Sequence, residues 1–458
     1  MTQGRSFGLK HDFDPQLCAE HLSALVQCPT RSFEDERKMD FDAFQQLHRH
    51  LEELFPLVHQ TLEKEVVGRA ALLYRWKGSG ASPHLPLLLM AHQDVVPEGD
   101  HADWRYPPFS GAIAEGRVWG RGSSDCKSKL LAQMEAIEWL ISQGYRPEYD
   151  LYLAYGYNEE LCGGSQPSAR LLADRFQSLG LRFSGIIDEG GGLQSGRGNG
   201  VDRDVCVIAL GEKGFAHIDL ICEDLGGHAS RPRKNGPFVK LAQAILAIEQ
   251  NPMPYRITDI VRQRFRTLAP YMTDRTLAAL LSDVDANWEQ LLPIIDADPN
   301  LAALFHTTIA VTMAQGSPMI NMLPNRVSLS LNAHLLPGDT LEDLQKHLES
   351  IVPEGIQVRI SGKTASPISR SDSPLARLIY ELRREDSPEC ILLNDLFLPA
   401  SDASYMYGLS DCVYRFSPFL PKDPPGNAHG INESMGISSL ATGPDFYVRL
   451  ITRYGDMK

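Results

Sequence analysis

The sequence predicts an α/β protein whose chain is interrupted by a smaller unit of mixed α+β structure. Three observations favour this fold class. Strand-like apolar runs alternate with helix-like segments up to about residue 211, the pattern changes there, and the α/β pattern resumes after about residue 363. Alternating strands and helices are typical of a sheet covered by helices, with functional loops at the strand ends. We therefore expect one domain built from residues 1–211 and 363–458, with residues 212–362 inserted into it.

The first part of the chain is expected to alternate between helices and strands. Apolar side chains recur at helical spacing near the start, and short apolar runs follow as strands. Gly144 is a typical stop signal for the helix before it. The expected elements, in chain order, are helical structure over about 14–65, a strand over 85–91, an irregular stretch over 97–122, a helix over 127–143, and strands over 150–157 and 182–188.

The inserted residues 212–362 show a different pattern. Apolar and polar positions alternate as in half-buried strands, and Pro337-Gly338-Asp339 has the composition of a turn. The expected elements are a strand over 215–222, a helix over 238–250, mostly helical structure over 252–306, strands over 307–314 and 326–335, a helix over 341–351 and a strand over 356–361.

Composition excludes some classes of function. The 458 residues carry a formal net charge of −14, and such an acidic surface repels phosphate backbones, so nucleic acid is not an expected partner. The chain shows no secretory signal pattern and no apolar window of the roughly 18 residues that a membrane helix needs. The eight cysteines form no CxxC pair and are expected to be reduced thiols. We therefore expect a cytoplasmic protein without membrane contact.

Polar side chains follow several of the predicted strands. His92 ends the first apolar strand, and Asp94 comes two residues later. A histidine can bind a metal through one ring nitrogen while a carboxylate holds the other. Asp125 lies just before a predicted helix, where it could bridge two metals or simply cap the helix. Taken alone, His92 is compatible with an ordinary hydrogen-bonded residue, and Asp125 with a helix cap.

Three further motifs lie later in the chain. Glu159 and Glu160 follow an aromatic strand, so that one can bind a metal while the other acts as a general base. Asp188 precedes Glu189 and three glycines, and His429 lies in a loop rich in Pro and Gly. Each of these motifs could also be a solvated loop. Together with His92 and Asp125, they supply nitrogen and oxygen ligands suited to two zinc ions, or to cobalt or manganese.

The motifs resemble those of a known enzyme family. MAHQDVVPEG, DWRYPPFSGAIAEGRVWGRGSSD, the pair Glu159-Glu160, IIDEGG and AHGINES occur in this order between Leu85 and Ile437. This set is similar to the dinuclear zinc family of aminoacylase, carboxypeptidase S and succinyl-diaminopimelate desuccinylase, and is most similar to the carboxypeptidase S branch. The resemblance implies a zinc-binding α/β catalytic domain interrupted by a lid domain that forms the homodimer.

The resemblance also implies a role for each motif residue. One zinc would be held by His92, Asp125 and Asp188, with Glu189 as the rival to Asp188. The other would be held by Asp125, Glu160 and His429, so that Asp125 bridges the two metals. The general base would be Glu159, and Asp94 would orient His92. From the lid, His228 of the partner subunit would stabilise the oxyanion, and Asn321 would bind substrate.

The sequence departs from the family pattern at three places. Cys126 stands where relatives usually have a second Asp. His334 lies 13 residues after Asn321, where many relatives have an Arg that binds a substrate carboxylate. The signature Thr-Asp-x-Arg is replaced by Ser401-Asp402-Ala403-Ser404. A histidine in place of the arginine offers at best a single, pH-dependent donor. Whether the substrate needs a free carboxylate is therefore open, unless Lys213, Arg231 or Arg326 replaces the clamp.

The expected activity is hydrolysis of an amide bond in a small peptide or N-acyl amino acid by a zinc-activated water. A strict dipeptidase or carboxypeptidase is an alternative that the sequence does not separate from an N-acyl hydrolase. A catalytically silent metal- or peptide-binding homologue is a second alternative, which loss of Glu159 or Asp125 would have favoured.

Overall fold

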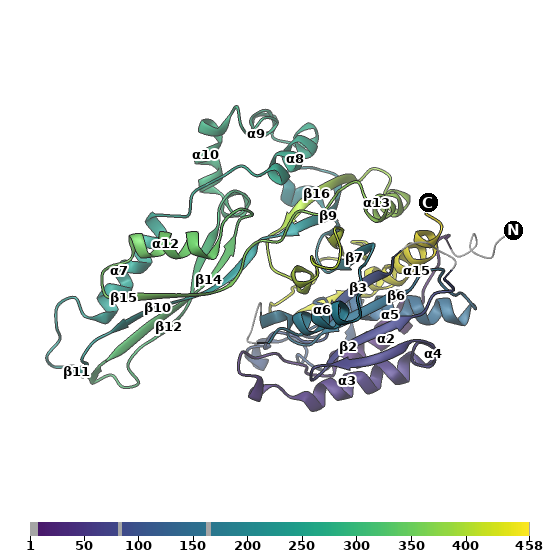
Figure 1. Cartoon of the computed structure of the whole chain (residues 1–458), viewed down its shortest axis with the longest axis horizontal. Helices are drawn as coiled ribbons and strands as arrows, with labels where there is room; N and C mark the ends of the chain where they lie inside the picture. The colour runs from purple at the N-terminus through teal and green to yellow at the C-terminus, as the bar shows by residue number, and fades with distance from the viewer. Residues whose placement is uncertain (1–7, 81–84, 162–165, 458) are drawn as a thin grey trace.

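The computed structural model describes residues 8–80, 85–161 and 166–457. Its main body is a nine-stranded sheet with helices on both faces (Figure 1), which confirms the predicted α/β class. The strands, in spatial order, are β1 (Glu63–Val67), β2 (Ala71–Trp76), β6 (Leu151–Gly156), β3 (Leu87–His92), β7 (Gly185–Asp188), β17 (Val413–Arg415), β9 (Asp204–Glu212) and β16 (Ile391–Phe397), with β8 (Gly192–Ser195) paired to β9.

The centre of this sheet is parallel. Strand β3 runs parallel to both β6 and β7, and β7 runs parallel to β17. Every residue of β3 and β6 is buried, because helices cover both faces. The continuous apolar runs of the sequence are the signature of such strands. As a result, the carboxyl ends of β6, β3 and β7 meet at one edge of the sheet.

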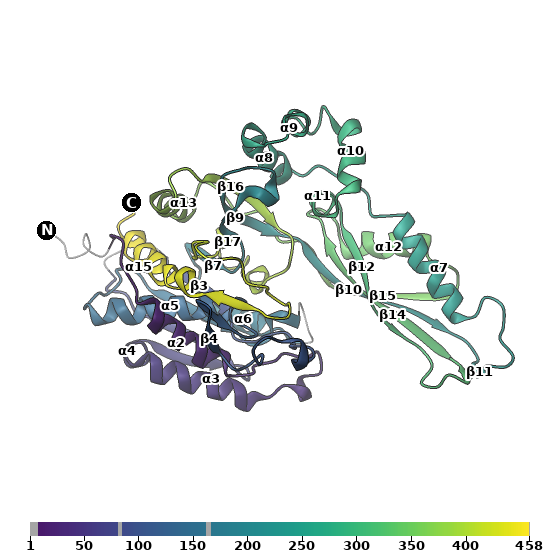
Figure 2. The same ribbon diagram turned by 180° about the vertical axis from the view of Figure 1, so that it is seen from behind.

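Helices form a layer on each face of the large sheet. One layer contains α2 (Pro15–Val26), α5 (Lys127–Ser142) and α15 (Thr442–Gly455), in which α5 packs against both other helices (Figure 2). The other face carries α6 (Ser168–Ser178). Helix α5 is buried on most sides, including Lys127, whose Nζ donates to the carbonyls of Leu25 and Cys28. This satisfied ammonium group fixes the start of α5, next to Asp125.

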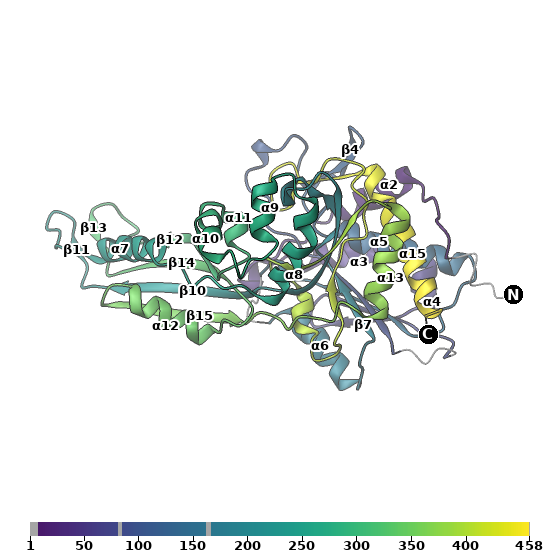
Figure 3. The same cartoon turned by 90° about the horizontal axis from the view of Figure 1, so that it is seen from above.

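The inserted residues form a second, four-stranded antiparallel sheet. Its core lies between this sheet and the helices α7 (Pro237–Gln250) and α12 (Leu341–Ile351). The sheet projects to one side of the main body (Figure 3). Its strands, in spatial order, are β12 (Thr308–Gln315), β14 (Arg326–Leu335), β10 (Gly214–Glu223) and β15 (Ile356–Lys363).

The helical part of the insertion packs differently. Helices α8 (Asp259–Leu268), α9 (Arg275–Leu281) and α10 (Trp288–Ala297) share the apolar core of the large sheet, and α8 lies against β16. The strands and the two helices α7 and α12 form the projecting unit. Among the described residues, no helix is long and apolar enough to cross a membrane.

Candidate metal centre

The parallel strands bring the first group of motif residues together. His92 is the last residue of β3, Glu159 and Glu160 lie just after β6, and Glu189 follows the end of β7. Since these three strands are neighbours and parallel, their carboxyl ends meet at one edge. Asp125 reaches the same place from the start of α5.

Two groups of side chains converge there and share Asp125. In the first, His92 Nε2 lies 3.1 Å from Asp125 Oδ1 and 3.5 Å from Glu189 Oε2, with the Cys126 thiol close by. In the second, His429 Nε2 lies 3.3 Å from Asp125 Oδ2 and 2.9 Å from Glu160 Oε2. Asp125 thus turns one carboxylate oxygen toward each group, which is the geometry of a bridging ligand.

The cluster contains several carboxylates close together, so positive charge at this place stabilises it. Burial, together with the charge of Asp125, raises the pKa of Glu189 to about 7, although His92 opposes the shift. Hydrogen bonds to Asp125 and Glu160 raise the pKa of His429 to about 10. The histidines therefore hold protons that partly balance the crowded carboxylates, and a cation could take over this role.

The donor set fits two divalent metals. Imidazole nitrogens and carboxylate oxygens suit zinc and similar borderline ions. The Glu160 Oε1 atom is buried and has no hydrogen-bond partner among the described residues, which leaves a lone pair for a ligand bond. The two groups differ in access, because the His429 side chain is 54% exposed whereas that of His92 is 1% exposed. Solvent can therefore reach the centre from the His429 side.

Asp94 positions both neighbouring ligand segments. His92 Nδ1 donates to the main-chain carbonyl of Asp94 at 2.9 Å, so that Nε2 remains available at the metal centre. The Asp94 carboxylate lies 3.5 Å from the same Nδ1 and accepts from the amides of Glu159 (3.1 Å) and Glu160 (3.2 Å). One fully buried aspartate thus orients the histidine and the glutamate pair together.

Asp188 and Glu189 make different contacts in the structure, a difference that the sequence did not reveal. Asp188 is buried, and its two oxygens accept from the amides of Glu189 (2.9 Å) and Ala403 (2.7 Å). It belongs to neither converging group of the described residues, whereas Glu189 belongs to the first. The structure therefore places Glu189 in a converging group of the described residues, and the metal-ligand role expected for Asp188 stays a prediction.

Sequence reasoning missed Glu433, which supports Asp125. Its Oε1 accepts from the amides of Ser124 (2.9 Å) and Asp125 (3.1 Å), and its Oε2 lies 2.7 Å from Arg121 Nη1. Both charged side chains are buried. The signal was present, because Glu433 is the glutamate of AHGINES, but its partner segment lies more than 300 residues away in the chain.

His228 and Asn321, which the sequence predicted to act on substrate, lie away from the centre within one chain. His228 lies in β11 (Gly227–His228), at the far end of the projecting sheet (Figure 1). Asn321 lies beside it and accepts from the amide of Ala229 at 3.0 Å, and both residues are exposed. His334 lies in β14, nearer the main body, in a second pocket that it shares with Lys213.

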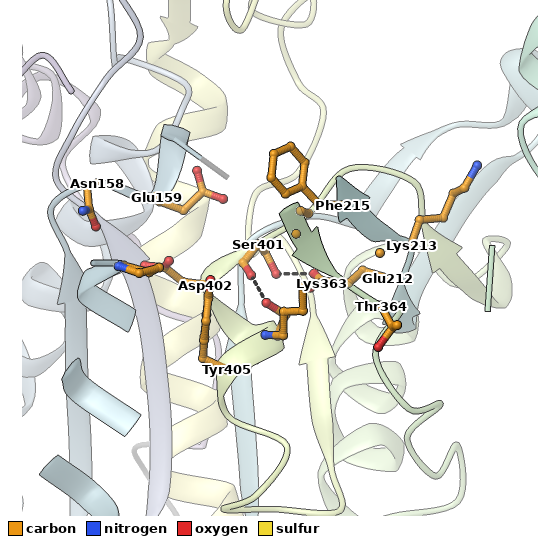
Figure 4. A pocket seen from close by; sticks show the side chains of 15 residues that line it. Asn158, Glu159, Glu212, Lys213, Phe215, Lys363, Thr364, Ser401, Asp402 and Tyr405 are labelled. Carbon is orange, nitrogen blue, oxygen red and sulfur yellow. Dashed lines mark hydrogen bonds between the residues drawn. The ribbon is translucent and has the colours of Figure 1, made fainter. Parts of the chain in front are cut away.

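A pocket of about 100 Å³ lies beside the centre, where the two sheets join. Glu159 lines it from the strand-end side, and Ser401, Ser404 and Tyr405 line it from the loop after β16 (Figure 4). Lys363, at the end of β15, completes this part of the wall. A substrate in this pocket would lie between Glu159 and the base of the lid.

Comparison with known proteins agrees with this geometry. The profile of peptidase family M20/M25/M40 matches residues 88–453. A probable carboxypeptidase S-like protein of Dictyostelium discoideum is 29% identical over 446 residues, which cover 94% of this chain and 84% of that protein. The N-fatty-acyl-amino acid synthase/hydrolase of Homo sapiens is 28% identical over 447 residues, which cover 94% and 86% of the two chains.

Solved structures show the same fold. The M20 family metallo-carboxypeptidase of Sulfolobus solfataricus aligns with a TM-score of 0.69 at 20% identity, over 95% of this chain and 98% of that one. Human carnosine dipeptidase 1 aligns with a TM-score of 0.70 at 15% identity, over 97% of each chain. With its fold, its converging carboxylates and histidines, and the match over most of its length, the chain belongs to the M20/M25/M40 family of metallopeptidases and is a metal-dependent amide hydrolase.

Proposed function

We propose that this protein is a two-zinc hydrolase that cleaves the amide bond of a small peptide or an N-acyl amino acid. The observation that carries the proposal is the position of Asp125 between two ligand groups, with Glu159 beside them in the adjoining pocket. Cobalt or manganese would fit the same nitrogen and oxygen ligands.

Each metal has a proposed set of ligands. His92, Asp125 and Glu189 would hold one ion, and Asp125, Glu160 and His429 would hold the other. The support is the convergence of their donor atoms and the buried, unpartnered oxygen of Glu160. Asp94 and Glu433 would hold the ligands in place through the hydrogen bonds described above.

The proposed mechanism uses Glu159 as the base. Two bound metals would polarise the amide carbonyl and lower the pKa of a shared water. Glu159 Oε2 lies 4.0 Å from His92 Nε2, and the side chain is only 8% exposed, so it faces the centre without bulk water around it. Glu159 would take the proton from the attacking water and then give it to the leaving nitrogen. His228 of the partner subunit would steady the oxyanion.

The support for a homodimer comes from the lid. Strand β12 is an edge strand whose side chains are exposed along most of its length. Val311 and Met313 of this strand are exposed, as are Ile320 and Met322 at the lid tip. An exposed apolar edge strand is a surface that pairs with another chain. We propose that residues 212–362 act as the lid and that two copies pair along β12, which would carry His228 and Asn321 to the partner's site.

The substrate class follows from the relatives, which include carboxypeptidases and an N-acyl amino acid hydrolase. A strict dipeptidase or carboxypeptidase is the alternative, and it would require a free α-amino group or a terminal peptide bond. Because Glu159 and Asp125 are both present at the centre, a catalytically silent homologue is disfavoured. The free thiols of the seven described cysteines support a reducing, cytoplasmic location.

The test is a product-resolved hydrolysis screen with chelated and zinc-reloaded protein. The panel holds dipeptides, N-acyl amino acids and their carboxamides. We expect zinc-dependent cleavage, and Glu159→Gln should keep both metals while lowering kcat by about 100-fold or more. Metal content measured on the same samples is the control. Unchanged turnover in Glu159→Gln would show that another group is the base, and no cleavage by fully loaded protein would contradict the activity.

A further inference from the structure

The base of the lid carries a cation with no assigned partner. Lys363 is the last residue of β15 and pairs across the sheet with Phe215 of β10, which pairs on its other side with His334. Lys363 and Phe215 line the pocket that contains Glu159 (Figure 4). His334 therefore lies across one strand from a lysine that lines the pocket.

The Lys363 ammonium group is buried and unsatisfied. Its Nζ has no hydrogen-bond partner within the part of the chain that the structure describes, and it lies 3.5 Å from the centre of the Tyr405 ring. Leaving a buried ammonium without an acceptor is costly, so such groups usually face a ligand or a counter-ion. Burial lowers the pKa of Lys363 to about 8, because the ammonium group has lost water without gaining a hydrogen-bond acceptor.

Glu212, an acid in the same wall, already has two other partners. Glu212 lies between Arg415 Nη2 (2.9 Å) and the Ser401 hydroxyl (2.6 Å), and both charged side chains are buried. Glu212 and Asp402 act on Lys363 through space, but within the described residues neither accepts a hydrogen bond from its ammonium group. An incoming carboxylate would therefore supply the acceptor that Nζ lacks.

The other candidate lysine, Lys213, already donates hydrogen bonds to main-chain carbonyls. Lys213 Nζ donates to the carbonyls of Ala303 (3.0 Å) and His306 (2.9 Å), and its side chain runs away from the pocket (Figure 4). Burial and the charge of Lys213 lower the pKa of His334, so that His334 is mainly neutral at pH 7. Lys213 therefore already has acceptors for its ammonium group, and His334 carries little positive charge at pH 7.

We propose that Lys363 binds the carboxylate of the substrate in the pocket beside Glu159. The inference rests on the proposed function, because it takes the amide to be cleaved as lying beside Glu159. In an N-acyl amino acid, or at the last bond of a peptide, the carboxylate lies next to the scissile amide. Lys363 and Glu159 line the same pocket, so a carboxylate and an amide of one substrate can face them together. The ring of Tyr405 would hold the ammonium in place between turnovers.

The test compares acids with matched carboxamides on zinc-loaded full-length protein. The probes are N-acetyl-phenylalanine, N-lauroyl-phenylalanine, alanyl-phenylalanine, and the primary carboxamide of each. We expect Lys363→Met to lower kcat/KM for the acids by about 10- to 100-fold, mainly through KM, because a charged hydrogen bond is lost. The carboxamides should change by less than about 2-fold, and Lys363→Arg should restore much of the preference for acids.

Two further measurements keep the outcome decisive. Lys346→Met removes the same charge from an exposed lysine of α12, paired there with Glu342, and should leave the preference unchanged. Calorimetric binding of the same probes to Glu159→Gln protein reports carboxylate recognition without turnover. One outcome is that wild type cleaves none of the probes, yet acids bind more tightly than their carboxamides and Lys363→Met removes this difference. In that case the proposed function fails and the anion site stands. The anion site is refuted if Lys363→Met lowers kcat/KM or affinity equally for acids and carboxamides, or if no acid is preferred to its carboxamide.

Discussion

Asp188 and Glu189 are adjacent acids, and the structure predicts opposite consequences for removing their charges. Asp188→Asn should destabilise the protein and keep the metals. Glu189→Gln should lose metal and keep the stability of the metal-free fold. The reason is that Asp188 is held by two backbone amides, whereas Glu189 faces His92 and Asp125 in the crowded centre.

The size of each effect follows from these contacts. The two hydrogen bonds to Asp188 are 2.9 Å and 2.7 Å long, and the residue is 2% exposed. An asparagine can accept only one of them well, and its amide group would oppose the other N–H. We expect a loss of about 2–4 kcal/mol in the free energy of unfolding, from one weakened and one unsatisfied buried bond. Loss of a supporting residue already costs about 10- to 100-fold in metal affinity, so removal of the ligand Glu189 should cost at least that.

The assay separates stability from metal binding. Urea unfolding in chelator gives the stability of each metal-free variant, and titration of a chromophoric zinc competitor gives its zinc affinity. Wild type and a surface variant, Glu342→Gln, are the controls, because Glu342 lies on the exposed face of α12. A loss of zinc in Asp188→Asn, together with normal zinc binding in Glu189→Gln, would refute the assignment of the two roles.

Three other changes have defined outcomes. Glu212→Gln should leave Arg415 as an unpaired buried charge and lower the free energy of unfolding by about 3–5 kcal/mol, measured by urea unfolding. Burial lowers the pKa of His334, so the unfolded state binds the proton first, and the free energy of unfolding should fall as the pH drops below the ordinary value of about 6.5. His334→Gln should reduce the slope of the free energy of unfolding against pH between pH 7 and pH 5.5. An unchanged slope would show that His334 is not responsible. Met313→Glu places a charge on the exposed face of β12 and should shift the particle from dimer to monomer in light scattering, whereas a particle of unchanged mass would argue against pairing along this strand.

Local sequence patterns determined the architecture of the main body. The apolar runs that end at His92 and before Glu159 are long enough for buried strands and too short for helices, and they are β3 and β6. Because parallel strands align their carboxyl ends, residues just after such runs could be expected at one edge. That rule alone was enough to place His92 and the glutamate pair together.

Other features depended on which distant segments meet, and only the tertiary structure decided them. Asp188 and Glu189 both carry a carboxylate. They differ because the main-chain amide of Ala403, far along the chain, donates a hydrogen bond to Asp188. Lys363 carries no motif, and its role depends on a pocket formed where two sheets join. Periodicity reports which face of an element is buried, because burial on one face repeats along the element. It carries no information on which partner from another part of the chain satisfies a particular polar atom, since that depends on packing between segments that the local pattern does not encode.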